Sequence, residues 1–135
     1  MEPRYLLDTD ICIYVHRSRP PQVLRRFQKL REGEAVVSVI TFGELLYGAA
    51  KSMRRIEALG RLDELKLLLH VLPLDEAAAD AYGVIRADLE SRGELIGNND
   101  LWIAAHSLSA GLILVTNNEK EFSRVKGLKV QNWAA

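Results

Sequence analysis

Short apolar runs alternate with helix-like segments along the whole chain, and this alternation restricts the possible folds more than any other feature. The strand-like runs lie near residues 4–7, 35–39, 71–73, 112–115 and 129–131. The run at 112–115 is apolar throughout, as is typical of a strand buried on both faces. Parallel strands need long crossover connections, and helices supply them here. We therefore expect an α/β fold with three layers, α/β/α, around a central, mainly parallel sheet of about four to five strands.

Helix signals mark the intervening segments. Pro20 and Pro21 pre-set the first turn of a helix that runs to about Arg31, because proline suits the first helical position. Asp75 can cap a helix that Gly93 ends. Other helices are predicted over residues 11–17, 41–51, 54–70, 98–109 and 119–124. The helix over 54–70 is amphipathic, so its apolar face suits either the core or a docking or dimer surface.

Length and composition indicate one globular unit. The chain has 135 residues, 48% of them hydrophobic and 27% charged, which suits one soluble domain with a sizeable core. No apolar run is long enough to span a membrane, and the N-terminus lacks an apolar signal core. The single cysteine, Cys12, excludes an internal disulfide and fits a reducing compartment. We expect a cytoplasmic protein that does not associate with membranes.

Acidic side chains recur where the strand-like runs end. Asp8 and Asp10 follow the first run, Glu44 stands shortly after the second, and Asp100 opens a predicted helix. Parallel strands end at one edge of a sheet, where open α/β folds bind their ligands. Clustered carboxylates repel one another unless a cation neutralises them. The pattern therefore indicates a site for a hard divalent metal ion.

Each acid also has a purely structural explanation. Residues 41–44 and 116–119 match the capping-box pattern, and Asp10 can cap the helix that follows it. Asp100 suits the positive end of a helix. Asp8 is harder to explain in this way, because it ends a strand. Helix capping alone does not explain why the acids gather at one sheet edge.

Two other classes of α/β protein also place acids after strands. Residues 8–10 (DTD) resemble the nucleophile motif of haloacid-dehalogenase phosphatases, and residues 114–117 resemble their second motif. Those enzymes need a further lysine and an acidic pair on later strands, for which the remaining chain is too short. Receiver-like phosphoacceptor domains need an aspartate after the third strand and a lysine after the fifth, and neither can be placed. A dehalogenase-like phosphatase is therefore a minor alternative.

Basic residues gather between positions 17 and 31, although the whole chain balances 18 lysines and arginines against 18 acids. This segment contains no acid and six bases, namely Arg17, Arg19, Arg25, Arg26, Lys29 and Arg31. Such a segment can follow the phosphates of a nucleic acid. A solvated helix face explains it equally well.

Four segments occur together in a characteristic order: 6–14 (LLDTDICIY), 38–49 (SVITFGELLYGA), 96–106 (IGNNDLWIAAH) and 114–122 (LVTNNEKEF). This arrangement resembles the PIN domain, and in particular the VapC-type toxins of bacterial toxin–antitoxin pairs. The resemblance extends over essentially the whole chain. It implies that residues 1–135 form a single PIN domain.

The resemblance also assigns residues to a metal site. It implies that Asp8, Glu44 and Asp100 form the catalytic, metal-binding acidic core, while Asp10 replaces an asparagine found in many relatives. It places Asn118 at the fourth acidic position, beside Glu119 and Glu121. Either Asn118 or Glu121 can complete the site.

Two hydroxyl groups adjoin these acids in the sequence. Thr9 follows Asp8 directly, and Thr116 lies in the last of the four family segments. Hydroxyl groups next to metal-binding carboxylates can hold them in position through hydrogen bonds. We expect this role for both threonines.

The activity implied by the resemblance is that of a Mg²⁺-dependent endoribonuclease toxin, with Mn²⁺ as an alternative metal. Water activated by the metal would attack a phosphodiester in structured RNA, for example a loop of tRNA or rRNA. Arg17, Arg19, Arg25 and Arg26 are the RNA-binding candidates. The implied partners are a VapB-like antitoxin, in a hetero-oligomer, and a second copy in a homodimer. The alternative is a PIN-like module that binds RNA or protein with weak or no catalysis.

Overall fold

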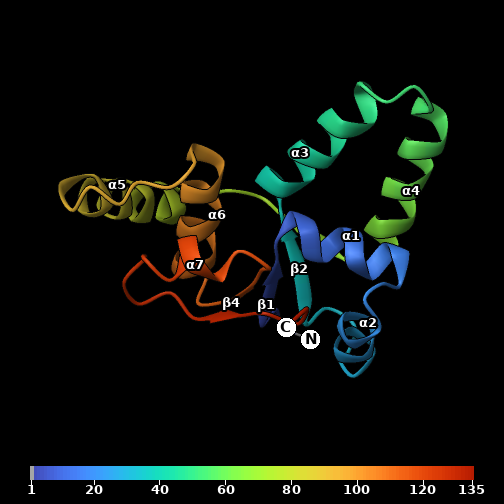
Figure 1. The fold of residues 1–135 in the computed structure, drawn as a ribbon, viewed down its shortest axis with the longest axis horizontal. Coiled ribbons are helices and arrows are strands. Elements are labelled where there is room, and N and C mark those ends of the chain that lie inside the picture. Colours follow the sequence, from blue (N-terminus) through green and yellow to red (C-terminus); the bar gives the residue numbers. More distant parts are fainter. Residues whose placement is uncertain (1) are drawn as a thin grey trace.

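The computed structural model describes residues 2–135, in which five strands form one parallel sheet (Figure 1). The strands are β1 (Tyr5–Leu7), β2 (Ala35–Ser38), β3 (His70–Leu72), β4 (Ile113–Val115) and β5 (Val130–Gln131). Their order across the sheet is β3-β2-β1-β4-β5, and every neighbouring pair is parallel. The expected mainly parallel sheet is confirmed.

Helices cover both faces of this sheet (Figure 1). One face carries α1 (Thr9–Arg17), α2 (Pro21–Gln28) and α4 (Arg55–Leu68). The other carries α5 (Glu76–Ser91), α6 (Asn98–Ser109) and α7 (Glu119–Phe122). Helix α3 (Val39–Ala50) starts directly at the end of β2 and runs away from the sheet toward α4. The three-layer α/β/α class is therefore confirmed.

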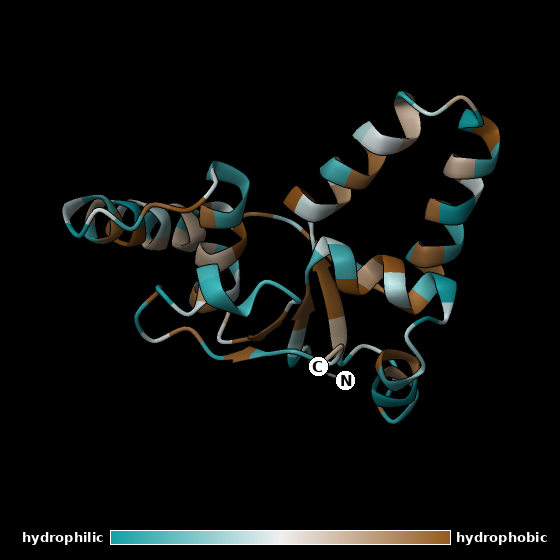
Figure 2. Cartoon of the chain, viewed as in Figure 1, coloured by the Kyte–Doolittle hydropathy of each residue, from teal (hydrophilic) through white to brown (hydrophobic). Residues whose placement is uncertain are grey.

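The alternation of side chains along each strand divides the core into two hydrophobic clusters. Leu6, Val36 and Leu114 point to the layer of α5, α6 and α7. Leu7 and Val37 point to the layer of α1, α2 and α4. Successive residues of a strand face opposite sides, so an all-apolar strand is needed wherever both faces are covered. Figure 2 shows the hydrophobic strands at the centre of the molecule.

Two helices begin earlier than the sequence patterns predicted. Helix α1 begins at Thr9, because Asp8 is its N-cap and accepts a hydrogen bond from the Thr9 amide. Helix α3 begins at Val39, where the Ser38 hydroxyl accepts from the Ile40 amide. The capping box predicted at residues 41–44 is therefore wrong, and so is Asp10 as a cap. In each case a cap residue at the strand end leaves no loop between strand and helix.

Helix α4 uses its apolar residues in two ways. Leu62 and Leu65 are buried, and Leu65 belongs to the core cluster beside the sheet, whereas Ile56 is 88% exposed and Leu67 is 84% exposed. Part of the predicted apolar face therefore belongs to the core, and part remains on the surface. Within residues 2–135, no helix combines the length and the hydropathy needed to cross a bilayer.

A core substitution should distinguish these two classes of leucine. Leu6 is fully buried at the centre of the sheet, so Leu6→Ala should lower the free energy of unfolding by about 2–5 kcal/mol. Leu67→Ala is the matched control and should change it by less than about 0.5 kcal/mol. Urea unfolding followed by circular dichroism measures both. Equal losses for the two variants would contradict the burial described above.

Candidate active site

Acidic residues meet at the carboxyl edge of the sheet, where β1 lies between β2 and β4. The chain leaves β1 toward one side of the sheet and later returns to β4 on the other side, so the strand order reverses at this point. Open α/β sheets bind ligands at such a reversal. Asp8 follows β1 here, and Thr116 follows β4.

Asp8 is the most buried of these acids, with 8% of its surface exposed. One carboxylate oxygen accepts the Thr9 amide at 2.8 Å, and the other accepts the Thr116 hydroxyl at 2.8 Å. Burial raises the pKa of Asp8, and the charges of Asp10 and Glu44 act in the same direction, against these two hydrogen bonds. Asp8 thus has both the structural role of a helix cap and the surroundings of a functional carboxylate.

Thr9 connects Asp8 to Glu44, which lies half-buried in the middle of α3. Its hydroxyl donates to the Glu44 carboxylate at 3.1 Å, while its amide donates to Asp8. Thr41 lies one turn before Glu44, and its hydroxyl is buried without a hydrogen-bond partner in the part of the chain described. Helix α3 therefore presents a carboxylate whose position depends on a residue of α1.

Asp100, in the first turn of α6, interacts with acids from three other parts of the chain. Its pKa is raised to about 6, first by burial and then by the charges of Asp8, Glu121 and Glu44; a hydrogen bond with Glu121 adds to this. Four carboxylates, one directly after β1 and the others on α3, α6 and α7, thus share one region. Asp10 lies next to it on α1 but is exposed.

Among the candidates for the fourth position, Glu121 is the one whose charge acts on Asp100. The backbone amide of Asn118 donates to the Thr116 hydroxyl at 3.0 Å. Glu119 accepts from the side chain of Asn132 at 3.0 Å. The capping box predicted at residues 116–119 is wrong, because the Thr116 hydroxyl donates to Asp8 and accepts from the turn instead of capping α7.

The carboxylates are near one another but do not yet form a coordination site. Among residues 2–135, no three acidic, histidine or cysteine side chains converge closely enough to hold a metal ion. The donor set consists of carboxylate and hydroxyl oxygens, which suits a hard divalent cation.

A groove of about 340 Å³ adjoins the acids between α1, α3 and α4. Thr9 and Glu44 line it together with Arg17 and Arg61. Arg17 was predicted to meet the substrate, whereas Arg61 was missed because it lies far from the basic segment in sequence. Only the packing of α4 against α1 brings it here.

The remaining predicted arginines do not line this groove. Arg19 and Arg25 are exposed at the surface. Arg26 donates to the Gln131 side chain at 3.1 Å, and its guanidinium lies 5.4 Å from the centre of the Trp133 ring. Arg26 therefore binds the C-terminal segment of its own chain.

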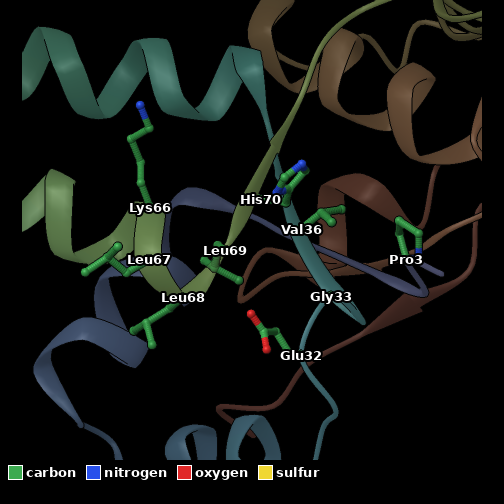
Figure 3. Close-up of a pocket in the computed structure, with 9 residues that line it drawn as sticks. All are labelled: Pro3, Glu32, Gly33, Val36, Lys66, Leu67, Leu68, Leu69 and His70. Carbon is green, nitrogen blue, oxygen red and sulfur yellow. The ribbon is translucent and has the colours of Figure 1, made fainter. Parts of the chain in front are cut away.

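A larger hollow, of about 520 Å³, lies at the opposite edge of the sheet (Figure 3). Glu32 and Gly33, just before β2, and His70, the first residue of β3, line it. None of the four clustered acids lines it. The larger hollow is therefore not the one beside the clustered carboxylates. We place the candidate site at these carboxylates, because their charges act on one another and hydroxyl groups donate to them.

The raised pKa of Asp100 predicts how the stability of the metal-free protein depends on pH. As pH rises above the ordinary pKa of 3.8, the unfolded chain loses this proton before the folded protein does, so the folded protein loses stability between pH 3.8 and about 6 and remains destabilised above that pH. Asp100→Asn should therefore raise the melting temperature by a few degrees near pH 8 and hardly change it near pH 4, in thermal melts with EDTA. Asp80→Asn, on the exposed side of α5, is the control. An equal effect of Asp100→Asn at both pH values would contradict the repulsion.

Known proteins share the sequence pattern and the fold of this chain. Residues 5–128 match the PIN domain family. The chain is 44% identical over 130 residues to the ribonuclease VapC2 of Haemophilus influenzae, covering 96% of this chain and 98% of that protein. It is 41% identical over 131 residues to the tRNA(fMet)-specific endonuclease VapC of Shigella flexneri, covering 97% and 98% respectively.

A solved structure of similar sequence has the same fold. The crystal structure of DNA-bound VapBC from Salmonella typhimurium matches with a TM-score of 0.90 and 37% identity, over 97% of this chain and 98% of that one. Family membership leaves no room for the dehalogenase-like alternative. The chain belongs to the PIN-domain family and, within it, to the VapC ribonucleases of VapBC toxin–antitoxin systems.

Proposed function

We propose that this protein is a metal-dependent endoribonuclease that hydrolyses RNA phosphodiesters at the carboxyl edge of its sheet. The observation that carries the proposal is the gathering of four carboxylates from four separate parts of the chain, with the pKa values of Asp8 and Asp100 both raised. A cluster of this kind is stable as an anion only beside a cation.

Asp8, Glu44, Asp100 and Glu121 would hold the metal, for which Mg²⁺ or Mn²⁺ fits the oxygen donors. When bound, such an ion lowers the pKa of water and neutralises the negative charge that develops on a phosphate under attack. Asp10, exposed beside Asp8, remains outside this set. Cation binding would also require Asp100 to lose its proton, so metal affinity should fall below about pH 6.

The protein's own contribution is to hold the carboxylates in position. The Thr9 amide donates a hydrogen bond to one carboxylate oxygen of Asp8, and the Thr116 hydroxyl donates to the other. These two bonds restrict the rotation of that carboxylate. The Thr9 hydroxyl restrains Glu44 in the same way. Groups held in place before the reaction need no reorganisation during it.

The RNA would approach through the groove beside the acids. Arg17 and Arg61 line that groove with Glu44, so they can pair with phosphates on either side of the cleaved bond. The relative from Shigella flexneri is named for tRNA(fMet), so tRNA is the first substrate to test.

Two of the solved relatives are VapBC complexes, and they indicate the partners. We propose that a VapB-like antitoxin binds this protein in a hetero-oligomer and that the toxin also pairs with itself. An RNA substrate agrees with the expected cytoplasmic location. A binding module without catalysis remains the second candidate, and metal-dependent turnover separates the two.

Conservative substitutions should separate the roles of the acids. Asp8→Asn keeps an oxygen for the Thr9 amide, so the α1 cap survives, and cleavage of tRNA should nonetheless fall at least about 100-fold. Glu121→Gln should reduce cleavage, whereas Asn118→Ala should leave it within a few-fold of wild type. Gel assays with Mg²⁺, Mn²⁺ or EDTA measure this, and melting curves control for folding. Full activity of Asp8→Asn would refute the assignment, and an inactive wild type would favour the binding module.

The arginines should divide according to their contacts. Arg17→Gln should weaken RNA binding and reduce the slope of log affinity against log salt by about 0.7, the value for one phosphate of a single strand. Arg26→Gln should leave that slope unchanged but destabilise the fold by about 0.5–1 kcal/mol, through loss of the contact with Trp133. Filter binding to catalytically inactive Asp8→Asn protein over a salt series measures the slopes. Equal slopes for both variants would contradict the role of Arg17.

A further inference from the structure

A buried polar contact joins two helices that carry opposite sides of the acidic site. The Ser38 hydroxyl lies 2.8 Å from Nδ1 of His106, and 0% and 2% of the two residues is exposed. Ser38 is the N-cap of α3, which carries Glu44, and His106 lies on α6, which carries Asp100. Neither residue belongs to the acidic cluster itself.

The hydrogen bonds around this pair define its protonation. The Ser38 hydroxyl already accepts from the Ile40 amide at 3.1 Å, so its own proton is free to point at Nδ1 of His106. Burial lowers the pKa of His106, against the opposing effects of Asp75 and the backbone of Pro73, and thereby favours the neutral ring. We assign the ring proton to Nε2. The Ser38 hydroxyl then donates to His106 on α6 and accepts from the Ile40 amide on α3.

Apolar side chains surround this contact. Val36 and Ile103 belong to the apolar cluster on this face of the sheet, and Ile40 packs against it. A hydrogen bond in such surroundings is strong, and an unpaired partner there is costly. Figure 1 shows α3 leaving the sheet at β2 and running toward α4, whereas α6 packs beside α5. The contact therefore lies near the start of α3, before the two helices diverge.

We propose that Ser38 and His106 form a positioning pair, which sets the placement of α3 relative to α6 so that Glu44 and Asp100 can act on the same cation. This inference rests on the proposed function, because it assigns the pair a purpose in cleavage. Neither side chain touches the substrate. A small error in the placement of either carboxylate lowers the rate, since catalytic groups must be held close to their working geometry.

The test compares three variants. His106→Leu fills the space but removes the acceptor, whereas His106→Asn retains an oxygen that can accept from Ser38. Ser107→Ala is the matched control: it removes another buried hydrogen bond of α6, from the Ser107 hydroxyl to the Leu112 carbonyl at 3.0 Å, which does not reach α3. Each variant is assayed for kcat and KM on tRNA and for melting temperature.

A second measurement reports the helix placement without metal, RNA or turnover. Spin labels at cysteines replacing Tyr47 on α3 and Ala110 at the end of α6, both exposed, give a distance distribution between the helices. Cys12 is buried and does not compete for the label. The distribution is recorded for the wild-type background and for each of the three variants.

The positioning role predicts a specific pattern of results. His106→Leu should lower kcat about 10- to 100-fold with little change in KM and should broaden or shift the distance distribution. His106→Asn should restore most of kcat and of the wild-type distance distribution. Ser107→Ala should lower the melting temperature without altering kcat or the distance distribution. Unchanged distance and kcat in folded His106→Leu protein would overturn the inference. An inactive wild type with a helix distance that depends on His106 would refute the proposed function alone.

Discussion

Burial of Asp8 among other carboxylates is the interaction on which the rest of the site depends. Desolvation and like charges both raise the pKa of this group, so the protein must supply donors to keep it in place. It does so with the Thr9 amide and the Thr116 hydroxyl, from the segments that follow β1 and β4. The site is thus assembled at the point where the two central strands end, and its unfavourable charge is what makes a cation a suitable ligand.

The same residues serve both the fold and the chemistry. Asp8 caps α1, and Ser38 caps α3 while it contacts His106 on α6. Structural and functional explanations of these residues therefore do not exclude each other. A helix that begins directly at a strand end places its first side chains at the sheet edge, where the ligand of an open α/β fold binds.

Most of the fold could be predicted from local sequence signals. Strand-like segments were predicted close to all five strands, and Pro21 and Asp75 marked helix starts, because such residues act on their immediate neighbours. The predicted start of α3 at Thr41 is wrong, because Thr41 also fits a capping pattern in the sequence. Only the hydrogen bond from the Ile40 amide to the Ser38 hydroxyl selects the earlier start. Arg61 was missed entirely, because its neighbours in the groove come from α1 and α3.

The sequence by itself determined the class of the fold, the family and the acids at the strand ends, since periodicity, caps and motif order are properties of the chain. Only the tertiary structure decided that Glu121 lies close enough to Asp100 to raise its pKa. It also decided that Arg17 faces the groove while Arg26 binds Trp133. These outcomes depend on distances between residues that are far apart in the sequence. Charge interactions and hydrogen bonds form only at short distances, so the fold decides which residues become partners.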